Sequence, residues 1–400
     1  KGRDRLDAIP GLLPAPGAAL PGCAFADRCL IARPRCRVEP PPLYDLGGGH
    51  GSRCHYHDEV PNLPRAEASK GAATAGPDRR GAPVLEAAGV SKTYTVGGRQ
   101  LQALRDISVQ LWPGETLGLV GESGSGKTTL ARLLLGLTAP DAGGKLALDG
   151  GSLPPLARSR STAQVKALQI VFQNPDSALN RSHTVQHLIG RAIGRLAGLR
   201  GAARQERLLA LVHGVRLADR HLAARPRQLS GGLKQRVAIA RAFAGDPRLV
   251  VCDEPTSALD VSVQAAILNL LTDLQAAQRV GYVFISHDLG VVRYLADRVA
   301  VLYLGRLMQL GPAEAVFAGP QHPYTEALLA AAPGAGSNER IRLHGDIPSP
   351  MDPPRGCVFQ TRCPRKIGAV CETEEPPLYL EDGNAVRCHI PRRELPRGAG

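Results

Sequence analysis

The stretch GESGSGKT, from Gly121 to Thr128, decides the fold. It fits the pattern G-x-x-x-x-G-K-[ST]; the apolar run TLGLV precedes it, and the helical pattern TLARLLLGL follows. Glycines let backbone N–H groups turn inward around phosphates, and the start of a helix adds partial positive charge. A strand, this loop and a helix in that order predict a phosphate-binding loop in an α/β domain.

Each residue of the loop has a predicted part in binding ATP. Lys127 is expected to reach the β and γ phosphates, and the Thr128 hydroxyl is expected to ligate Mg²⁺. A Gly/Ser-rich turn that matches the pattern by chance would not account for the flanking strand and helix. The remaining predicted phosphate-binding residues are Gly121, Glu122, Ser123, Gly124, Ser125, Gly126 and Thr129.

A second apolar run, LVVCDE, ends in two carboxylates, Asp253 and Glu254. Ligands of open α/β sheets collect at the carboxyl ends of strands, so Asp253 is expected to hold Mg²⁺ directly or through water. Glu254 is placed to polarise the attacking water. A carboxylate pair alone would more often cap a helix, but with the phosphate loop it indicates a nucleoside triphosphatase.

Strand and helix signals alternate along the same region. Residues Ala265 to Gln278 have apolar residues at helical spacing, and Asp176 to Arg227 has no strand run. The predicted fold class is an α/β P-loop ATPase with a helical subdomain at about 176–235 and a Cys-rich C-terminal tail. The apolar runs that predict strands are Thr116 to Val120, Leu249 to Cys252, Tyr282 to Ile285 and Val299 to Leu304.

The motif LSGG, from Leu229 to Gly232, narrows the class, because here the chain resembles the ABC ATPase family. The resemblance covers Val84 to Pro312 without a gap. In that family the signature contacts the γ-phosphate of a nucleotide held by the other subunit. The resemblance therefore implies a head-to-tail dimer with a second ABC ATPase domain, in which Ser230, Gly231 and Gly232 bind the partner's ATP.

Further landmarks of the family match individual residues. Tyr94 matches the aromatic side chain that stacks on adenine, Gln173 the glutamine that senses Mg²⁺ and water, and His287 the histidine that contacts the γ-phosphate. SALD, at 257–260, matches a loop that crosses the dimer interface. The signature departs from many relatives, because Leu233 and Lys234 follow it where a glutamine is common.

Two segments resemble each other. GCAFADRC and GCVFQTRC each precede a further cysteine, PPLY and RCH, and the matching cysteines lie 334 or 335 residues apart. This spacing would hold one repeat unit. The expected organisation is the tail of a preceding ABC unit at 1–59, a linker at 60–83, a nucleotide-binding domain at 84–315 and a C-terminal extension at 316–400. Because the chain opens at Lys1, we expect a fragment of a fused pair of ATPases.

Eight of the nine cysteines form two sets with the spacing C-x5-C-x6-7-C-x16-17-C, and Cys252 is expected to be a small core residue. In a reducing compartment four thiolates suggest a [4Fe–4S] cluster, with zinc or redox-sensitive free thiols as alternatives. A tail so short and Pro-rich is expected to need a metal centre as its core. The sets are Cys357, Cys363, Cys371 and Cys388, and Cys23, Cys29, Cys36 and Cys54.

The tails, HPYTEALL and NPDSALN resemble the dipeptide/oligopeptide branch of bacterial ABC importers. This implies two membrane permeases, an extracytoplasmic solute-binding protein and a peripheral place on the cytoplasmic face of the membrane. The formal net charge of +13 also fits a soluble ABC-type ATPase that acts on nucleic acid or ribosomes. Because Arg is spread along the chain without interleaved aromatics, the charge alone does not decide. Such ATPases carry long coiled-coil or zinc-bearing insertions, or a basic helical linker between two cassettes, and none is visible in this sequence, so no nucleic acid is expected. A redox-sensing ATPase is a third reading.

Overall fold

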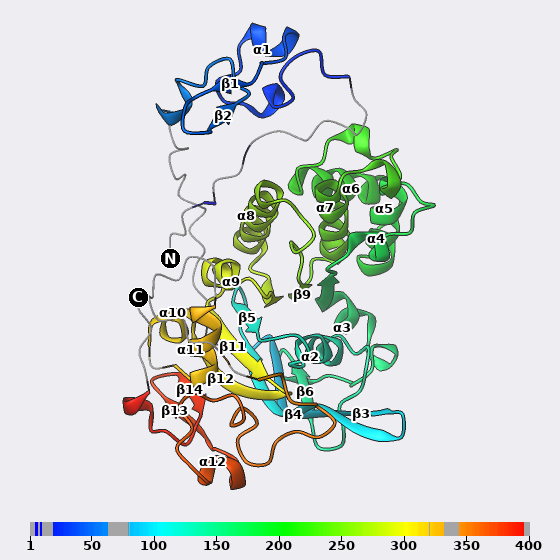
Figure 1. The fold of residues 1–400 in the computed structure, drawn as a ribbon. Coiled ribbons are helices and arrows are strands. Elements are labelled where there is room, and N and C mark those ends of the chain that lie inside the picture. Colours follow the sequence, from blue (N-terminus) through cyan, green and yellow to red (C-terminus); the bar gives the residue numbers. More distant parts are fainter. Residues whose placement is uncertain are drawn as a thin grey trace.

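Two β-sheets form the body of the molecule, as the computed structural model shows (Figure 1). The larger sheet has eight strands in the order β13-β14-β12-β11-β5-β10-β9-β8, and the smaller has the order β4-β3-β6-β7. The structure describes residues 5–6, 9, 19–62, 79, 81–319, 321–331, 343 and 345–395. No helix in these ranges is long and apolar enough to span a bilayer.

The centre of the larger sheet is parallel. All five residues of β5 and β10 are buried, and such continuous apolar runs are typical of parallel strands covered on both faces. The four predicted strands are confirmed to within two residues at each end. The strands are β5 (Thr116–Val120), β8 (Leu168–Val171), β9 (Leu249–Asp253), β10 (Gly281–Ile285), β11 (Arg298–Tyr303) and the antiparallel β12 (Arg306–Pro312).

The smaller sheet is antiparallel and lies over helix α2. Its two long strands are joined by a turn at Gly97 and Gly98, both at positive φ, which a tight hairpin requires. It carries Tyr94 on its first strand. The strands are β3 (Leu85–Val96), β4 (Arg99–Leu111), β6 (Lys145–Leu148) and β7 (Gly151–Ser152).

Helices cover the sheets and form a second layer (Figure 1). In the stretch 176–227 the described residues contain helices and no strand, as the sequence predicts. Helix α5 packs against α6 and α7 around Ile189, Val212 and Val237, all fully buried. The helices are α2 (Lys127–Leu134), α3 (Thr162–Ala167), α4 (Pro175–Ala178), α5 (Val185–Leu196), α6 (Gly201–Gly214), α7 (Gly231–Ala242), α8 (Val261–Gln278) and α9 (Leu289–Leu295).

The C-terminal extension continues the larger sheet. Strand β14 pairs with β12, with Val386 opposite Gln309, and β13 follows β14 at the edge. Phe359 is fully buried in one cluster with Tyr303 and Tyr324. The expectation that this tail needs a metal as its core is therefore wrong, because the cassette supplies that core. The elements are α10 (Ala313–Ala318), α11 (Pro323–Ala330), α12 (Val370–Thr373), β13 (Leu378–Glu381) and β14 (Asn384–Arg387).

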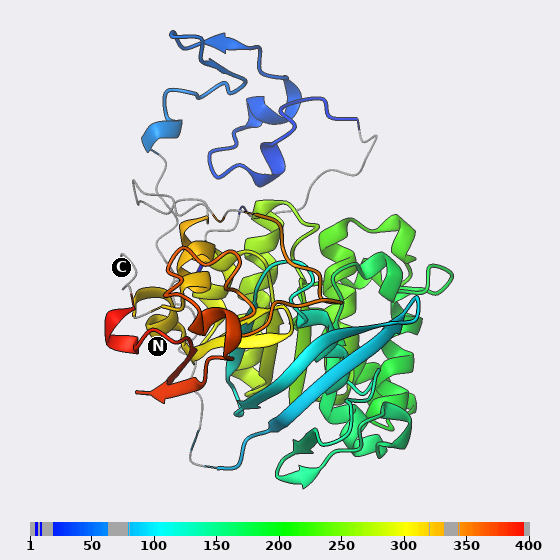
Figure 2. The same ribbon diagram turned by 60° about the horizontal axis from the view of Figure 1, so that its bottom comes forward.

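The two Cys-rich tails repeat the same local structure on opposite sides of the cassette (Figures 1 and 2). The Cys23 N–H donates to the Cys36 carbonyl at 2.7 Å, and the Cys357 N–H donates to the Cys371 carbonyl at 2.9 Å. Each has a short helix after its second cysteine and an antiparallel hairpin. The first tail has α1 (Pro34–Val38), β1 (Tyr44–Asp45) and β2 (Gly51–Ser52).

Most of the predicted linker at 60–83 lies outside the described residues. Val84, at the predicted start of the nucleotide-binding domain, is fully buried. Cys252 is also fully buried in β9, so its expected place in the core is confirmed.

Candidate nucleotide site

The predicted phosphate loop connects β5 to α2. Gly121 has a φ of +146° and Gly126 a φ of +106°, conformations that L side chains rarely adopt. A Cβ atom at Gly121 would lie 2.2 Å from the Leu302 carbonyl oxygen, and one at Gly126 would lie 2.7 Å from the Ala103 carbonyl oxygen. The loop is thus packed against backbone that cannot move aside, and only glycine fits at both positions.

The Lys127 ammonium group lies inside this loop. It donates to the carbonyl oxygens of Gly121 at 2.7 Å and Glu122 at 2.9 Å. Burial lowers the pKa of Lys127, while the nearby carboxylates of Glu254 and Asp253 oppose that shift. The phosphate loop and the two strand carboxylates, 125 or more residues apart in sequence, therefore form one site. Thr128 and Thr129 occupy the first turn of α2 beside Lys127.

Three predicted catalytic residues meet at the Glu254 carboxylate. The Gln173 amide donates to Glu254 Oε2 at 2.8 Å, and His287 Nδ1 lies 3.4 Å from Glu254 Oε1. The Ser257 hydroxyl, in the SALD loop, donates to the Glu254 carbonyl oxygen at 3.1 Å. The structure thus brings together side chains that follow β8, β9 and β10, the strands that end at one edge of the sheet.

Glu254 has a left-handed backbone, with φ at +45°. Its N–H donates to the Ile285 carbonyl oxygen on the neighbouring strand at 3.0 Å, which holds the residue in this conformation. Non-glycine residues at positive φ are uncommon, and strained residues persist where surrounding structure fixes them. The strained backbone directs the carboxylate toward Gln173 and His287.

The carboxylate pair suits a divalent cation. Burial raises the pKa of Asp253, and the negative charge of Glu254 raises it further, while Arg132 and Lys127 lower it. A cation between these two neighbouring carboxylates and the phosphates would stabilise their negative charges in the partly buried site. Mg²⁺ usually takes one or two carboxylates plus phosphate oxygens. Asp253 and the Thr128 hydroxyl therefore fit the chemistry of a Mg²⁺ site that a nucleotide completes.

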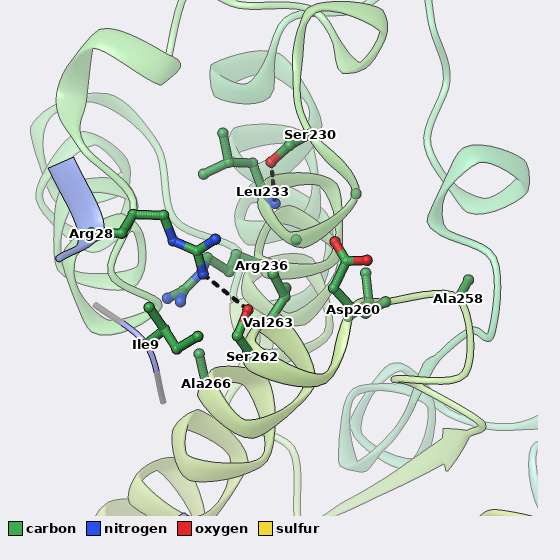
Figure 3. A pocket seen from close by; sticks show the side chains of 13 residues that line it. Ile9, Arg28, Ser230, Leu233, Arg236, Ala258, Asp260, Ser262, Val263 and Ala266 are labelled. Carbon is green, nitrogen blue, oxygen red and sulfur yellow. Dashed lines mark hydrogen bonds between the residues drawn. The ribbon is translucent and has the colours of Figure 1, made fainter. Parts of the chain in front are cut away.

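The signature residues lie at a separate place, at the start of α7. Ser230 is the N-cap residue, and its hydroxyl accepts a hydrogen bond from the Leu233 N–H at 3.5 Å. Ser230, Gly231 and Gly232 line a cavity with Asp260 of the SALD loop (Figure 3). Arg28 of the first tail also lines it and donates to the Ser262 hydroxyl at 2.9 Å. None of the residues that line this cavity comes from the phosphate loop.

Lys234, which follows the signature where many relatives carry a glutamine nearby, forms an ion pair. The Lys234 ammonium group donates to both carboxylate oxygens of Asp176, at 2.9 and 3.0 Å. This ion pair joins α7 to α4, which follows Gln173 by two residues. Lys234 therefore links the signature helix α7 to the segment that carries Gln173. The sequence did not indicate this role.

Tyr94 lies on β3, opposite Leu101 of β4. The Lys92 ammonium group lies 5.4 Å from the centre of its ring, within the range of a cation–π contact. Its predicted stacking on adenine stays a prediction.

The four thiols of the C-terminal extension lie near one another. Burial raises the pKa of Cys357 to about 12, and the thiols of Cys388, Cys363 and Cys371 contribute to the shift. Across the described ranges, however, no group of three or more His, Cys, Asp or Glu side chains has an arrangement that could hold a metal ion. The structure therefore gives the predicted [4Fe–4S] cluster and its zinc alternative no support.

The extension also reaches the phosphate loop, which the sequence did not predict. Arg362 donates to both carboxylate oxygens of Glu122, at 2.7 and 3.1 Å. The Tyr324 hydroxyl accepts a hydrogen bond from the Glu122 N–H at 2.8 Å. The recurrence of an arginine before the second cysteine of both tails, as Arg28 and Arg362, was the available signal.

Comparison with known proteins shows the family to which this chain belongs. Residues 104–257 match the family model described as ABC transporter. A protein of Sinorhizobium fredii, named a probable peptide ABC transporter ATP-binding protein, is 45% identical over 294 residues, covering 72% of this chain and 83% of its own length. The chain belongs to the ATP-binding proteins of ABC transporters. It is therefore an ATPase, and ATP and Mg²⁺ are its expected ligands.

Other matches agree with this ABC membership. Residues 1–36 and 308–371 match the model for the oligopeptide/dipeptide transporter C-terminal region, so both tails belong to this type. A dipeptide transport ATP-binding protein of Haemophilus influenzae is 43% identical, covering 77% of this chain and 97% of its own. An ATP-binding cassette solved as a dimer with ADP and phosphate matches with a TM-score of 0.52 and 29% identity, over 57% of this chain and 98% of that chain.

Proposed function

We propose that this ABC ATPase energises the import of peptides or similar small solutes. The observation that carries the proposal is the match of residues 308–371 to the C-terminal region of oligopeptide/dipeptide transporters, in a chain whose relatives are named for peptide transport. The same relatives give no support to an ATPase that acts on nucleic acid or ribosomes, or to a redox sensor.

The residues around Glu254 would carry hydrolysis. Glu254 would polarise the attacking water, since Gln173 and His287 fix its carboxylate from two sides. Lys127 would leave the Gly121 and Glu122 carbonyl oxygens for the β and γ phosphates. Bound Mg²⁺ would supply charge neutralisation on the phosphates. His287 would contact the γ-phosphate from the exposed side of the site.

The separation of the signature from the phosphate loop supports a head-to-tail dimer. In that arrangement the Ser230 hydroxyl and the N–H groups at the start of α7 form an anion site for a partner's nucleotide. Helices α4 to α7 would form the helical subdomain, and Gln173 would lie beside a permease. The other proposed partners are two transmembrane permeases and an extracytoplasmic solute-binding protein, with this chain on the cytoplasmic face of the membrane.

The proposed domains follow from the repeat. Residues 1–59 would be the tail of a preceding unit, 60–83 a linker, 84–315 the nucleotide-binding domain and 316–400 its extension. The matching hydrogen bonds of Cys23 and Cys357 support the equivalence of the tails.

Reconstitution tests the function. In liposomes that contain the permease pair, the binding protein and this chain, we expect peptide uptake that requires MgATP. Glu254→Gln should bind ATP normally and lower turnover by at least about a hundredfold, because it removes the group that activates water. Arg365→Met, which breaks an ion pair with Glu326 away from the catalytic group and the signature, is a control and should keep most activity. Peptide-independent ATPase activity without uptake would contradict the import function.

A metal centre in the tails is a finer proposal. The thiols of Cys363, Cys371 and Cys388 lie close enough to Cys357 to raise its pKa, although no three of these described side chains are arranged to hold a metal ion. The metal centre would be a [4Fe–4S] cluster, with zinc as the alternative. Anaerobically purified protein should then contain iron and acid-labile sulfide in equal amounts, and Cys363→Ser should lower both. Protein with neither iron nor zinc would contradict the proposal.

A further inference from the structure

The strongest link between the extension and the ATP site is an ion pair at Glu122. Both nitrogens at the end of the Arg362 side chain face the two carboxylate oxygens, at 2.7 and 3.1 Å. The Arg362 side chain is 8% exposed and that of Glu122 is 25% exposed. Paired, parallel hydrogen bonds of this kind fix direction as well as distance. The extension thus holds the side chain of the second loop residue.

A second contact holds the backbone of the same residue. The Glu122 N–H donates to the Tyr324 hydroxyl at 2.8 Å, and Tyr324 is fully buried. Arg362 also donates to the Tyr303 hydroxyl, at 3.4 Å. Glu122 is therefore held through its main chain and its carboxylate by two residues that lie 202 and 240 positions further along.

A packed aromatic group makes these two contacts rigid. The ring of Phe359 lies 5.2 Å, centre to centre, from the rings of both Tyr303 and Tyr324. Such spacing is typical of well-packed aromatic pairs. Phe359 and Arg362 belong to the same turn of the extension, between Cys357 and Cys363. The position of the loop therefore depends on the packing of the Cys-rich segment.

The charge of Glu122 gives this arrangement a consequence for binding. The Glu122 carbonyl oxygen accepts a hydrogen bond from the Lys127 ammonium group at 2.9 Å, so Glu122 is part of the loop that would surround the phosphates, and its carboxylate also acts on that ammonium group. An unpaired carboxylate there would repel ATP and would compete with the phosphates for Lys127. Arg362 neutralises it and turns it toward the extension.

We propose that Arg362 and Tyr324 are positioning residues of the ATP site, through which the C-terminal extension keeps Glu122 away from the nucleotide phosphates. The inference rests on the proposed function of the loop as an ATP site. The extension is then part of the nucleotide-binding machinery. The first tail carries the equivalent Arg28, which contacts Ser262 instead.

Nucleotide affinity tests the inference. The dissociation constant of MgATP is measured on the full chain by competition with a fluorescent ATP analogue. For Arg362→Met we expect a rise of about tenfold, close to 1.4 kcal/mol, because Glu122 stays partly open to water and the repulsion is screened. In Glu122→Gln/Arg362→Met the repelling charge is gone, so affinity should return to within about threefold of the wild type.

A matched control lies three residues away. Arg365 makes a similar paired contact with Glu326, at 2.7 and 2.8 Å, without touching the loop. Arg365→Met should therefore bind MgATP like the wild type. If Arg362→Met binds equally well, or if Glu122→Gln/Arg362→Met binds as weakly as Arg362→Met, the inference is wrong, and Arg362 only braces the extension. Failure of both the wild type and Arg365→Met to bind would overturn the proposed function as well.

Discussion

At the scale of single residues, the site joins groups that are far apart in the sequence. Gln173, Glu254 and His287 could be predicted because each matches a family motif, and Glu254 and His287 also follow apolar runs that predict strands. Arg362 could not be assigned a role, because its recurrence before the second cysteine of both tails marks the position but does not indicate a partner 240 residues away. The role of the Lys127 ammonium group at the phosphates could be predicted from the loop motif. The role of the Arg362 guanidinium group, which holds Glu122 of the loop, could not.

Lys127 makes nucleotide binding sensitive to alkaline pH. Burial lowers the pKa of its ammonium group, so the free chain loses this proton at lower pH than an exposed lysine does. Bound phosphates favour the charged form, so binding above the lowered pKa requires proton uptake. The dissociation constant of MgATP should therefore rise with pH, by up to about tenfold per unit above that pKa.

Titration of MgATP binding between about pH 7 and pH 10 measures the effect. Lys127→Arg provides the comparison, since its guanidinium stays charged over this range and should give a flat profile. A wild-type profile as flat as that of Lys127→Arg would contradict the assignment of Lys127 to the phosphates.

At the scale of elements, the strands that could be predicted from the sequence are those whose residues are almost all buried. The strands β5, β9, β10 and β11 are nearly continuous apolar runs and could be placed from sequence to within two residues. Strands β3 and β4 could not, because polar residues alternate along them and their pairing shifts register between Ala87 and Val90. The hairpin β13–β14 was not predicted, for two reasons. Strand β13 is exposed throughout, and β14 pairs with β12, where Leu310 lies opposite Ala385, 75 residues further along the chain.

At the scale of the whole molecule, one chain carries two half-sites, the phosphate loop and the signature, and in the proposed dimer the same partner chain would complete both. A head-to-tail dimer predicts that lesions in different halves complement each other. Lys127→Ala damages the phosphate loop, and Ser230→Arg blocks the signature. Random mixing makes half of the dimers mixed, each with one complete site, so ATPase activity should recover to about a quarter of the wild type.

The measurement is the ATPase activity of the mixture of Lys127→Ala and Ser230→Arg chains, compared with the activity of each variant alone. Mixing Lys127→Ala with Thr128→Ala is the matched control, because both lesions lie in the loop and no dimer then has a complete site. Equal activity in the two mixtures would contradict the head-to-tail arrangement.

The pairing of β14 with β12 also bears on how the chain can be divided. Strand β12 contains Leu307 and Met308, both almost completely buried. Without the hairpin, its unpaired N–H and C=O groups would form an open sheet edge beside apolar side chains, which is a template for intermolecular strand addition. A cassette cut at the sequence boundary near residue 315 would thus be prone to aggregate, and in a longer chain the edge would stay open during synthesis until residue 387 had emerged.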